Sequence, residues 1–485
     1  MIAIANVLRA LEHDGLLLGT RGSLPGEVAL VTDDSRQAAP GALFLAVRGT
    51  ERDGHAFVPA AEAAGAAVIV VDDAAVGAGP AIVVRDTRQA AAVVAAAAYG
   101  FPARALDIVG ITGTNGKTTT AGLLRHLLDG AGDEAASIGT LGVLRGSEGE
   151  PVPGGGGLTT PGPVELQRIL RALADAGVRT VAMEVSSHSL HQHRVDGIAF
   201  SAGVFTNLTR DHLDYHGTME DYLEAKAGLV DRVREGGAIV VNADDRAWDR
   251  LATGRRTVRF GAALNAEVRF SDVTFSPRGS RFVLSAQGQQ HEVALPLIGD
   301  FNVQNAVGAA AAAIACGLPA REAAVRLATS PQVPGRLEVV NEHPTVLRDY
   351  AHTPDALERA LGAVRPFARG RLVVVFGCGG DRDRGKRPLM GGIAEKHADA
   401  VILTSDNPRT EDAQKILDDI ESGMTHRRHL RIEDRRDAIA HAIANAGADD
   451  VVLLAGKGHE DYQIRGTEKL PFDEKLIVRE LVGTA

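Results

Sequence analysis

The stretch "GITGTNGKTTT" at residues 110–120 combines glycines, a lysine and threonines in an order suited to holding a phosphate group. Gly113 and Gly116 let backbone N–H groups approach an anion, and a helix beginning near Lys117 directs its positive end toward the same point. Lys117 would neutralise phosphate charge, and Thr118 would offer a hydroxyl to Mg²⁺. The stretch predicts a nucleoside triphosphate site, and the alternative is an ordinary glycine-rich turn.

The elements around this stretch fit that prediction. The apolar run "ALDIVGITG" precedes it as a strand, and "KTTTAGLLRHLLDG" follows it as a helix. This strand, loop, helix order is the context that a phosphate loop requires. Ile111 stands where the standard pattern has its first glycine, and the chain has no Asn-Lys pair of the kind that reads a guanine base. A kinase or a ligase remains.

Composition excludes several classes of protein. The 485 residues carry a net charge of −10 and only 4% aromatics, which argues against nucleic acid as a partner. Cys316 and Cys378 lack C-x-x-C spacing, so we expect neither a zinc site nor a disulfide framework, and a cytoplasmic location fits best. The longest apolar run, at 90–100, is too short to span a bilayer, so it predicts a buried helix and no membrane insertion.

The distribution of strands and helices predicts an α/β chain of three domains. A small N-terminal α/β domain covers 1–103. A central P-loop domain with a mononucleotide-binding parallel sheet covers 104–331 and includes an antiparallel elaboration at 257–297. A linker at 330–336 leads to a C-terminal Rossmann-like domain over 332–485. Ligands of such sheets gather at the carboxyl ends of the strands.

Several polar residues follow the predicted central strands. Glu184 ends the strand in "RTVAMEVSSH", where it is either a metal-binding carboxylate or a solvated acid at a strand end. Asp211, His212 and Asp214 follow another strand. Lys226 comes fourteen residues after His212 on a predicted helix, and its residue type and position alone indicate a surface lysine.

A set of longer motifs identifies a family. The stretches "GTNGKTT", "MEVSSH", "HLDYHGTMEDYLEAK", "DYAHTPDAL", "GCGGDRDRGKRP", "DNPRTE" and "AGKGHEDYQ" together resemble the Mur ligases of peptidoglycan synthesis, over essentially the whole chain. The resemblance implies domains for a UDP-substrate, for ATP and for an amino acid. It also implies that ATP phosphorylates the D-Glu γ-carboxylate of UDP-MurNAc-L-Ala-D-Glu. An amino acid then attacks the acyl phosphate, a step that depends on position and charge neutralisation.

The resemblance also implies how ATP and two Mg²⁺ ions are held. In this family the loop begins at Gly113, so Ile111 is no defect. Thr118 and Glu184 would hold one Mg²⁺, and His212 would hold the second together with Lys226 carbamylated by CO₂. A carbamate supplies an anionic oxygen that suits Mg²⁺, whereas an ammonium repels it. The implied catalytic residues are Lys117, Glu184, His212 and Lys226. The implied ATP contacts are Gly113, Thr114, Asn115, Gly116, Lys117, Thr118, Thr119, Asn305, Arg336 and Asp349.

The UDP-linked dipeptide has its own implied contacts. Uridine and diphosphate would lie near "DDSR" and the loop after "GALFLAVRG", and the muramoyl peptide near the central strands. The implied positions are Asp33, Ser35, Thr50, Glu51, Arg52, Thr159, Thr160, Ser186, Gln192 and Arg194. Leu158 departs from the family pattern, which often has a polar substrate contact there.

The intact "DNPR" stretch, Asp406, Asn407, Pro408 and Arg409, implies meso-2,6-diaminopimelate as the third substrate. The arginine would pair with its distal carboxylate. Arg387, Gly456 and Glu460 would complete the pocket, with Glu460 meeting the distal ammonium. The alternatives are L-lysine or L-ornithine as substrate, a related Mur or folylpolyglutamate-type ligase, or a nucleotide-binding regulator without ligase activity. The resemblance favours a monomer.

Overall fold

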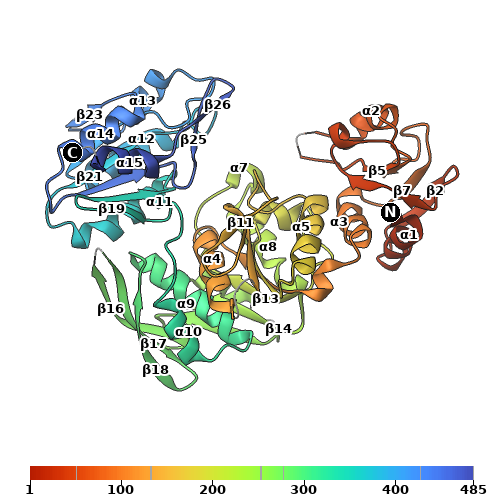
Figure 1. Cartoon of the computed structure of the whole chain (residues 1–485), viewed down its shortest axis with the longest axis horizontal. Coiled ribbons are helices and arrows are strands. Elements are labelled where there is room, and N and C mark those ends of the chain that lie inside the picture. Colours follow the sequence, from red (N-terminus) through yellow and green to blue (C-terminus); the bar gives the residue numbers. More distant parts are fainter. Residues whose placement is uncertain (51, 131–133, 252–253, 277, 427, 484–485) are drawn as a thin grey trace. The chain divides into compact units, whose positions relative to one another are not determined.

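The computed structural model describes every residue except 51, 131–133, 252–253, 277, 427 and 484–485. Contacts divide the chain into two compact units. The first unit comprises Met1–Arg269, Ser285–Gln289 and Asn305–Arg326, and the second comprises Phe270–Leu284, Gln290–Gln304 and Leu327–Ala485. Figure 1 shows sheets with helices along the whole sequence, so the α/β class expected from the sequence is confirmed.

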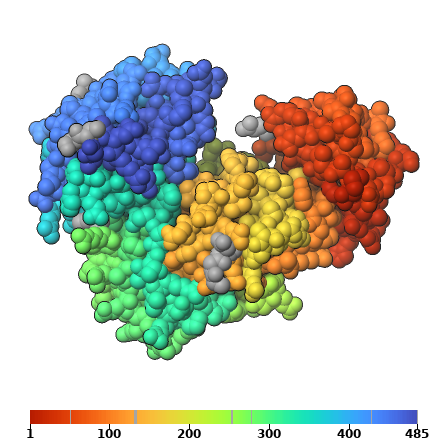
Figure 2. Space-filling model, in the orientation of Figure 1, coloured from red at the N-terminus to blue at the C-terminus, as the bar shows by residue number. Residues whose placement is uncertain are grey.

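The N-terminal part of the first unit is built on a five-stranded sheet of order β2-β7-β6-β5-β4. The strands β4 to β7 are parallel, and β2 runs antiparallel to β7. Its buried apolar residues belong to two core clusters, and this part is drawn in red to orange in Figure 2. Its elements are β1 (Ile2–Ala3), α1 (Ile4–His13), β2 (Leu17–Arg21), β3 (Glu27–Val28), β4 (Leu30–Thr32), β5 (Ala42–Leu45), α2 (Val58–Ala63), β6 (Val68–Val71), β7 (Ala81–Val84) and α3 (Thr87–Ala98).

The alanine-rich run predicted as a buried helix is α3, and this prediction is confirmed. Asp86 caps the helix by accepting from the Arg88 and Gln89 backbone N–H groups. Every residue from Ala90 to Ala97 is buried, because small side chains let the helix pack closely against its neighbours.

The central part of the first unit carries strands in the order β11-β10-β9-β12-β8-β13-β14-β15. From β9 to β15 the neighbours are parallel. The elements are β8 (Asp107–Thr112), α4 (Lys117–Leu128), β9 (Ala135–Gly139), β10 (Gly142–Arg145), β11 (Glu150–Val152), α5 (Pro163–Asp175), β12 (Thr180–Glu184), α6 (Ser187–His191), β13 (Phe200–Phe205), α7 (Leu213–His216), α8 (Met219–Ala227), β14 (Val233–Asn242) and β15 (Thr257–Gly261). The carboxyl ends of β8, β9, β12 and β13 therefore share one edge.

The predicted start of the antiparallel elaboration, residue 257, is wrong. An antiparallel arrangement was expected from residue 257, yet β15 runs parallel to β14, and the first residues of β16 run parallel to β15. The pairing partner sets the strand direction, and side-chain alternation does not reveal it. The following elements are β16 (Val268–Ser276), β17 (Gly279–Ala286), β18 (Gln289–Leu295), α9 (Asp300–Ala315) and α10 (Ala320–Leu327).

The second unit contains a sheet of order β19-β20-β24-β21-β22-β23, parallel except for β19 at one edge. Apolar residues of α11, α12 and α13 pack on one face, and those of α14 and α15 on the other. The elements are β19 (Glu338–Glu342), β20 (Thr345–Asp349), α11 (Pro354–Val364), β21 (Leu372–Phe376), α12 (Lys386–His397), β22 (Ala400–Leu403), α13 (Ala413–Glu421), β23 (His429–Arg431), α14 (Arg435–Ala444), β24 (Val451–Ala455), β25 (Tyr462–Arg465), β26 (Glu468–Pro471) and α15 (Glu474–Gly483). In the described parts of the chain, no helix has both the length and the hydropathy needed to cross a membrane.

Candidate active site

The glycine loop between β8 and α4 adopts a backbone that only glycine tolerates at two positions. Gly113 has φ 142° and Gly116 has φ 85°. A Cβ on Gly113 would lie 1.9 Å from Thr206 Oγ1, and one on Gly116 would lie 2.2 Å from Asn305 Oδ1. The loop is thus packed tightly between the end of β13 and α9, and Asn305, an expected ATP contact, lies beside it.

Polar side chains that follow β13 form hydrogen bonds with the backbone of the glycine loop. Asn207 accepts from the Asn115 backbone N–H at 2.9 Å, and Thr206 Oγ1 donates to the Asn115 carbonyl at 2.7 Å. Lys117 Nζ folds back to the carbonyls of Gly113 at 2.9 Å and Thr114 at 2.8 Å. The sequence motif does not include Thr206 and Asn207, although both directly follow a predicted strand.

Glu184 lies at the end of β12 and is 1% exposed, so the alternative of a solvated acid is wrong. Its Oε2 accepts from the Thr118 hydroxyl at 3.1 Å and from the Thr140 hydroxyl at 3.2 Å. Its Oε1 accepts from the Thr140 backbone N–H at 2.9 Å. Gly139 makes room for this carboxylate, since a Cβ there would lie 2.1 Å from Oε1. The Thr118 hydroxyl and the Glu184 carboxylate therefore lie together beside the loop, and both carry oxygen atoms of the kind that binds metal ions.

Lys226 on α8 is 1% exposed, so the expectation of a surface lysine is wrong. Its Nζ donates to the Gly113 carbonyl at 2.8 Å and lies 4.4 Å from the centre of the Tyr222 ring. Burial, reinforced by the cationic Lys117, lowers the pKa of Lys226 well below its usual value. Two lysine amines thus share the Gly113 carbonyl, which favours an uncharged amine at Lys226.

His212 is the N-cap residue of the short helix α7 and has a left-handed backbone, φ 53°. Its ring meets His188 edge-on at 4.8 Å between centroids, and its Nε2 lies 3.4 Å from an Asp211 carboxylate oxygen. Burial lowers the pKa of His188 to about 4, so that imidazole is neutral near neutral pH. Among the residues that the structure describes, no three His, Cys, Asp or Glu side chains form a ready metal cluster.

The residues expected to grip the muramoyl peptide form a connected network. Thr160 Oγ1 donates to the Glu184 carbonyl at 2.9 Å and accepts from the Ser186 backbone N–H at 3.1 Å. Arg194 donates to the Thr160 carbonyl at 3.1 Å and to the Gln192 side-chain oxygen. The Thr140 hydroxyl also reaches Thr159 at 3.3 Å. The network therefore joins the expected peptide contacts to Glu184. Leu158 is 49% exposed.

The expected uridine contacts follow neighbouring parallel strands of the N-terminal sheet. Asp33 directly follows β4, and Ser35 begins a short 3₁₀ helix after it. Thr50 and Arg52 belong to the segment after β5, where the Arg52 carbonyl accepts from the Gly49 N–H at 2.9 Å. Because β4 and β5 are parallel neighbours, both segments leave the same edge of the sheet. Glu51 lies outside the described residues.

The remaining expected ATP contacts belong to the second unit. Asp349 ends β20, and its carboxylate accepts from the Leu337 N–H at 2.7 Å. Burial raises the pKa of Asp349 to about 6, and the Arg336 cation opposes that rise. The Arg336 guanidinium lies 4.9 Å from the centre of the Tyr350 ring. This cluster gives the end of β20 a cation over an aromatic ring and a buried acid.

The loops after β22 and β24 meet in the second unit. Asn407 Nδ2 donates to Glu460 Oε2 at 2.9 Å. Gly456 passes close to the Asp406 side chain: a Cβ on Gly456 would lie 2.5 Å from an Asp406 carboxylate oxygen. Lys457, fully buried, donates to Asn407 and Glu460. The structure therefore brings the "DNPR" and "GKGHE" stretches together, and the sequence interpretation had assigned no role to Lys457.

Two arginines of this region differ in their surroundings. Arg409 has φ 51° and donates to the Gly380 carbonyl at 2.9 Å, so it is held at the loop. Arg387 is 1% exposed, and its guanidinium pairs with Glu411 at 2.9 Å and Asp419 at 2.8 Å. Arg387 also donates to the Gly379 carbonyl, so it braces the chain that leaves β21. Its expected contact with substrate stays a prediction.

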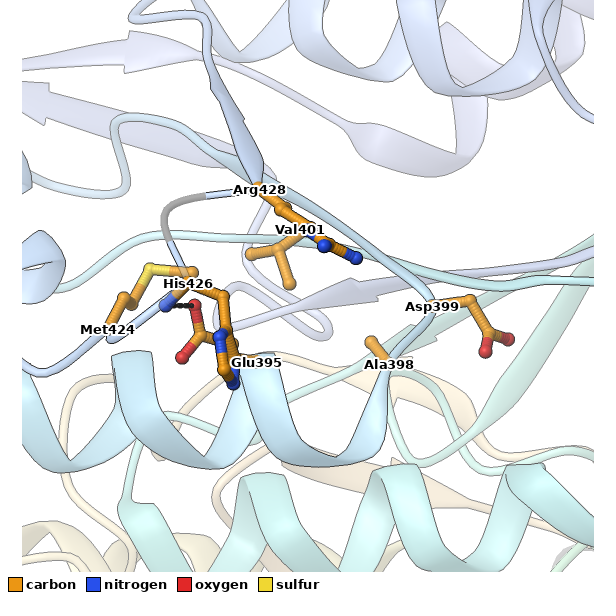
Figure 3. Close-up of a pocket in the computed structure, with 7 residues that line it drawn as sticks. All are labelled: Glu395, Ala398, Asp399, Val401, Met424, His426 and Arg428. Atoms are coloured by element: carbon orange, nitrogen blue, oxygen red, sulfur yellow. Dashed lines mark hydrogen bonds between the residues drawn. The ribbon is translucent and has the colours of Figure 1, made fainter.

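A cavity of about 270 Å³ lies elsewhere in the second unit (Figure 3). Asp399 and Glu395 line it, together with Ala398, Val401, Met424, His426 and Arg428. Asp399 precedes β22, whereas the "DNPR" residues follow that strand. The cavity is therefore at the opposite end of the strand from the expected third-substrate residues, and none of the candidate site residues lines it.

Comparisons with known proteins relate the chain to one family. Three family models match the chain: "Mur ligase family, catalytic domain" over 27–103, "Mur ligase middle domain" over 111–313 and "Mur ligase, glutamate ligase domain" over 335–458. Together they cover most of the chain, and all the expected contacts except Glu460 fall within them.

Individual relatives match almost the whole chain. The UDP-N-acetylmuramoyl-L-alanyl-D-glutamate–2,6-diaminopimelate ligase of Geobacillus kaustophilus (strain HTA426) is 43% identical over 95% of this chain and 96% of its own length. The protein of that name from Synechococcus elongatus is 45% identical over 91% of both chains. A solved structure of a ligase with that name is 34% identical, with a TM-score of 0.67, over 94% of this chain and 95% of its own. The chain therefore belongs to the Mur ligase family of ATP-dependent ligases.

Proposed function

We propose that the chain adds meso-2,6-diaminopimelate to the D-Glu γ-carboxylate of UDP-MurNAc-L-Ala-D-Glu, in peptidoglycan synthesis. The observation that carries this proposal is the Thr118–Glu184 contact beside the loop lysine Lys117. Two oxygen atoms of the kind that binds Mg²⁺ and a cation lie near the start of α4, and the positive end of that helix supports binding of a nucleotide's terminal phosphates. The names of the relatives support the choice of substrates.

The reaction has two steps. A γ-carboxylate oxygen forms a bond to the γ-phosphorus of ATP while the bond to the β,γ-bridging oxygen breaks, and ADP leaves. The neutral amine of the amino acid then forms a bond to the acyl carbon, phosphate leaves, and the amine loses a proton. Lys117 and the N–H groups of the glycine loop bind and orient the phosphates. The chain's contribution is position and charge, as phosphoryl transfer demands.

Thr118 and Glu184 supply suitable ligands for one Mg²⁺ as they stand. His212 and Lys226 suit a second Mg²⁺ only after Lys226 is modified. The Thr118 hydroxyl and the Glu184 carboxylate supply oxygen, which Mg²⁺ prefers. When bound, Mg²⁺ neutralises charge on the transferred phosphate. His212 and Lys226 suit a second Mg²⁺ only if Lys226 is carbamylated, because an amine or ammonium is a poor ligand for a hard cation.

We infer that CO₂ carbamylates Lys226. An uncharged amine is the form that attacks CO₂: the nitrogen forms a bond to carbon, one C=O π bond breaks and leaves its electron pair on oxygen, and the nitrogen loses a proton. The lowered pKa of Lys226 supplies that form. The resulting anion would also balance Lys117, which shares the Gly113 carbonyl with Lys226. The environment therefore favours the modified side chain over an ammonium.

We propose that Arg409 and Glu460 recognise the distal end of meso-diaminopimelate. Arg409 would pair with the carboxylate, and Glu460 would accept from the ammonium. The contact between Asn407 and Glu460 supports this role, because it joins the two loops that carry these groups. L-lysine and L-ornithine lack the distal carboxylate and leave Arg409 without a partner.

Three domains are proposed for these three substrates. Residues 1–103 would bind the UDP moiety, 104–331 ATP, and 332–485 the amino acid. The three family models, which fall within these ranges, support the division. A monomer acting in the cytoplasm, where ATP and UDP-linked precursors are available, completes the proposal. Its product would serve wall growth, and through it cell shape and division.

Phosphate release tests the proposal. The protein is supplied with ATP, Mg²⁺ and UDP-MurNAc-L-Ala-D-Glu, and meso-diaminopimelate, L-lysine, L-ornithine, D-Ala-D-Ala and glutamate are added in separate reactions. We expect release and a ligated product with meso-diaminopimelate. Preference for another amine would identify a different ligase, and no release with any amine would favour a nucleotide-binding regulator. Arg409→Ala should weaken the reaction with meso-diaminopimelate more than the slow reaction with L-lysine.

A further inference from the structure

The loops that follow β22 and β24 carry the residues expected to bind the third substrate, and we call them the third-substrate loops. A lysine that the proposed reaction does not use lies buried among them. Lys457 follows β24 and is 0% exposed. Its Nζ lies 3.1 Å from Asn407 Oδ1, 3.2 Å from Glu460 Oε2 and 3.8 Å from Asp406 Oδ1. A buried ammonium is costly unless it is paired and hydrogen-bonded, so these contacts are what keep it there.

The contacts of Lys457 fix two other side chains. Glu460 Oε2 accepts from both Lys457 and the Asn407 amide. Asn407 Oδ1 accepts from Lys457 and from the Ile464 backbone N–H at 2.9 Å. The ammonium therefore sets which way the Asn407 amide faces and where the Glu460 carboxylate lies. Both side chains come from the stretches assigned to the third substrate.

The backbone around Lys457 holds it in this direction. Gly456 has φ 115° and Gly458 has φ 54°, conformations that favour glycine. A Cβ on Gly458 would lie 2.7 Å from the Tyr350 Cβ, and one on Gly456 would meet Asp406. The two glycines let the chain pass tightly between β20 and the "DNPR" loop, which leaves Lys457 aimed at the carboxylates.

The charges of the side chains around Lys457 favour meso-diaminopimelate over L-lysine. Lys457 and Arg409 are positive, and Asp406 and Glu460 are negative, so the four side chains balance. The distal end of meso-diaminopimelate is also balanced, with one ammonium and one carboxylate. The distal end of L-lysine carries only an ammonium. Without Lys457 the four positions would have an excess negative charge that suits L-lysine better.

We propose that Lys457 is a specificity-determining positioning residue of the third-substrate pocket. It acts through Glu460 and Asn407, which it holds in place, and through its charge, which makes the pocket reject an amino acid with an unbalanced distal ammonium. This inference rests on the proposed function, because it assumes that Glu460 and Arg409 face the distal end of the amino acid.

Lys457→Met tests the proposal, because methionine has similar length without charge. We expect kcat/KM with meso-diaminopimelate to fall about 100-fold, as on truncating one member of a buried charged network. With L-lysine kcat/KM should fall far less or rise, so the preference shifts by at least about tenfold. The KM values for ATP and for the UDP-linked dipeptide should stay unchanged. Lys457→Arg, which keeps the charge, should retain the preference.

The matched control is Lys469→Met. Lys469 lies on β26, is exposed, and places its Nζ 3.6 Å from the centre of the Tyr462 ring, whereas the buried Lys457 lies 5.7 Å from the same ring. This variant should keep the substrate preference. If Lys457→Met does not fold, Lys457→Gln is measured in its place. An unchanged preference in the folded variant would overturn the inference. No turnover of meso-diaminopimelate by the parent enzyme would instead overturn the proposed function.

Discussion

The glycine-loop region and the third-substrate loops each bury a lysine near the carboxyl edge of a parallel sheet. Lys226 is 1% exposed and Lys457 is 0% exposed. Lys226 Nζ donates to the Gly113 carbonyl and lies over the Tyr222 ring, and neither group has a full charge. Lys457 Nζ lies beside the Glu460 and Asp406 carboxylates.

The difference shows how partners decide what a buried amine can do. Burial and the nearby Lys117 cation drive Lys226 toward the uncharged, reactive amine, and Asp211 only partly opposes them. Lys457 is compensated by carboxylates, so its ammonium can serve as a fixed structural charge. The same side chain is thus suited to chemistry in one sheet and to recognition in the other.

Lys226→Ala provides the strongest test of this contrast. Loss of the carbamate ligand should lower kcat/KM about 10³-fold, the scale of removing a strong electrostatic stabiliser. With ¹³C-labelled CO₂, the parent enzyme and Lys457→Met should both show a carbamate carbon signal, and Lys226→Ala should show none. Activity lost on CO₂ depletion should return with bicarbonate. Lys415→Ala, at an exposed position of α13, is the control. Full activity of Lys226→Ala would refute the carbamate.

Lys457 should stabilise the folded chain through its ion pairs with Glu460 and Asp406. Lys457→Met leaves Glu460 and Asp406 without their buried cation and should lower the unfolding free energy by about 3 kcal/mol. Adding Glu460→Gln should restore part of that loss, because one of the stranded charges is removed. Urea denaturation of the parent, the two single variants and the double variant measures the coupling. Strictly additive losses would show that the ammonium and the Glu460 carboxylate do not interact.

The pH dependence of stability should separate the two lysines further. The pKa of Lys226 is lowered on folding from an ordinary value of 10.5, so the unfolded chain binds the extra proton in the intervening pH range. Stability should therefore rise with pH up to the unfolded pKa, by up to about 1.4 kcal/mol per pH unit in CO₂-free buffer. The variant Lys226→Met should lack this component. Equal pH dependence of parent and variant in chemical denaturation would contradict a lowered pKa.

Much of the architecture could be predicted from the sequence. Apolar runs followed by polar residues correspond to β8, β12, β13, β20 and β24, and the alanine-rich run corresponds to α3. These signals are local, so they survive folding. The direction of β15 could not be predicted, because it depends on pairing with β14. The short strands β9 to β11 and the hairpin β25–β26 also lie where no strand had been assigned.

The candidate site could be predicted only in part for a similar reason. The glycine loop and Glu184 lie at strand ends, so the sheet brings them together. The burial of Lys226 depends on which face α8 turns inward, although Tyr222, four residues earlier on the same face, offered a signal. Thr140 follows β9, 44 residues before Glu184, and carries no motif of its own. Its contact with Glu184 appears only when β9 pairs with β12.

Thr140 offers the smallest effect and the finest test of the loop region. Thr140→Val removes the hydroxyl that donates to Glu184 Oε2 and leaves the backbone N–H bond to Oε1. The lost hydrogen bond is worth about 1 kcal/mol, so kcat/KM should fall roughly fivefold. Half-maximal activity should also require more Mg²⁺, because Glu184 is held less firmly. Thr140→Ser keeps the hydroxyl and should match the parent in both measurements. If the valine variant needs no more Mg²⁺ than the parent, the hydroxyl does not position Glu184; a raised requirement in the serine variant would instead report on the packing of the methyl group. The third-substrate loops lie in the other unit, so the preference for meso-diaminopimelate should be the same in both variants.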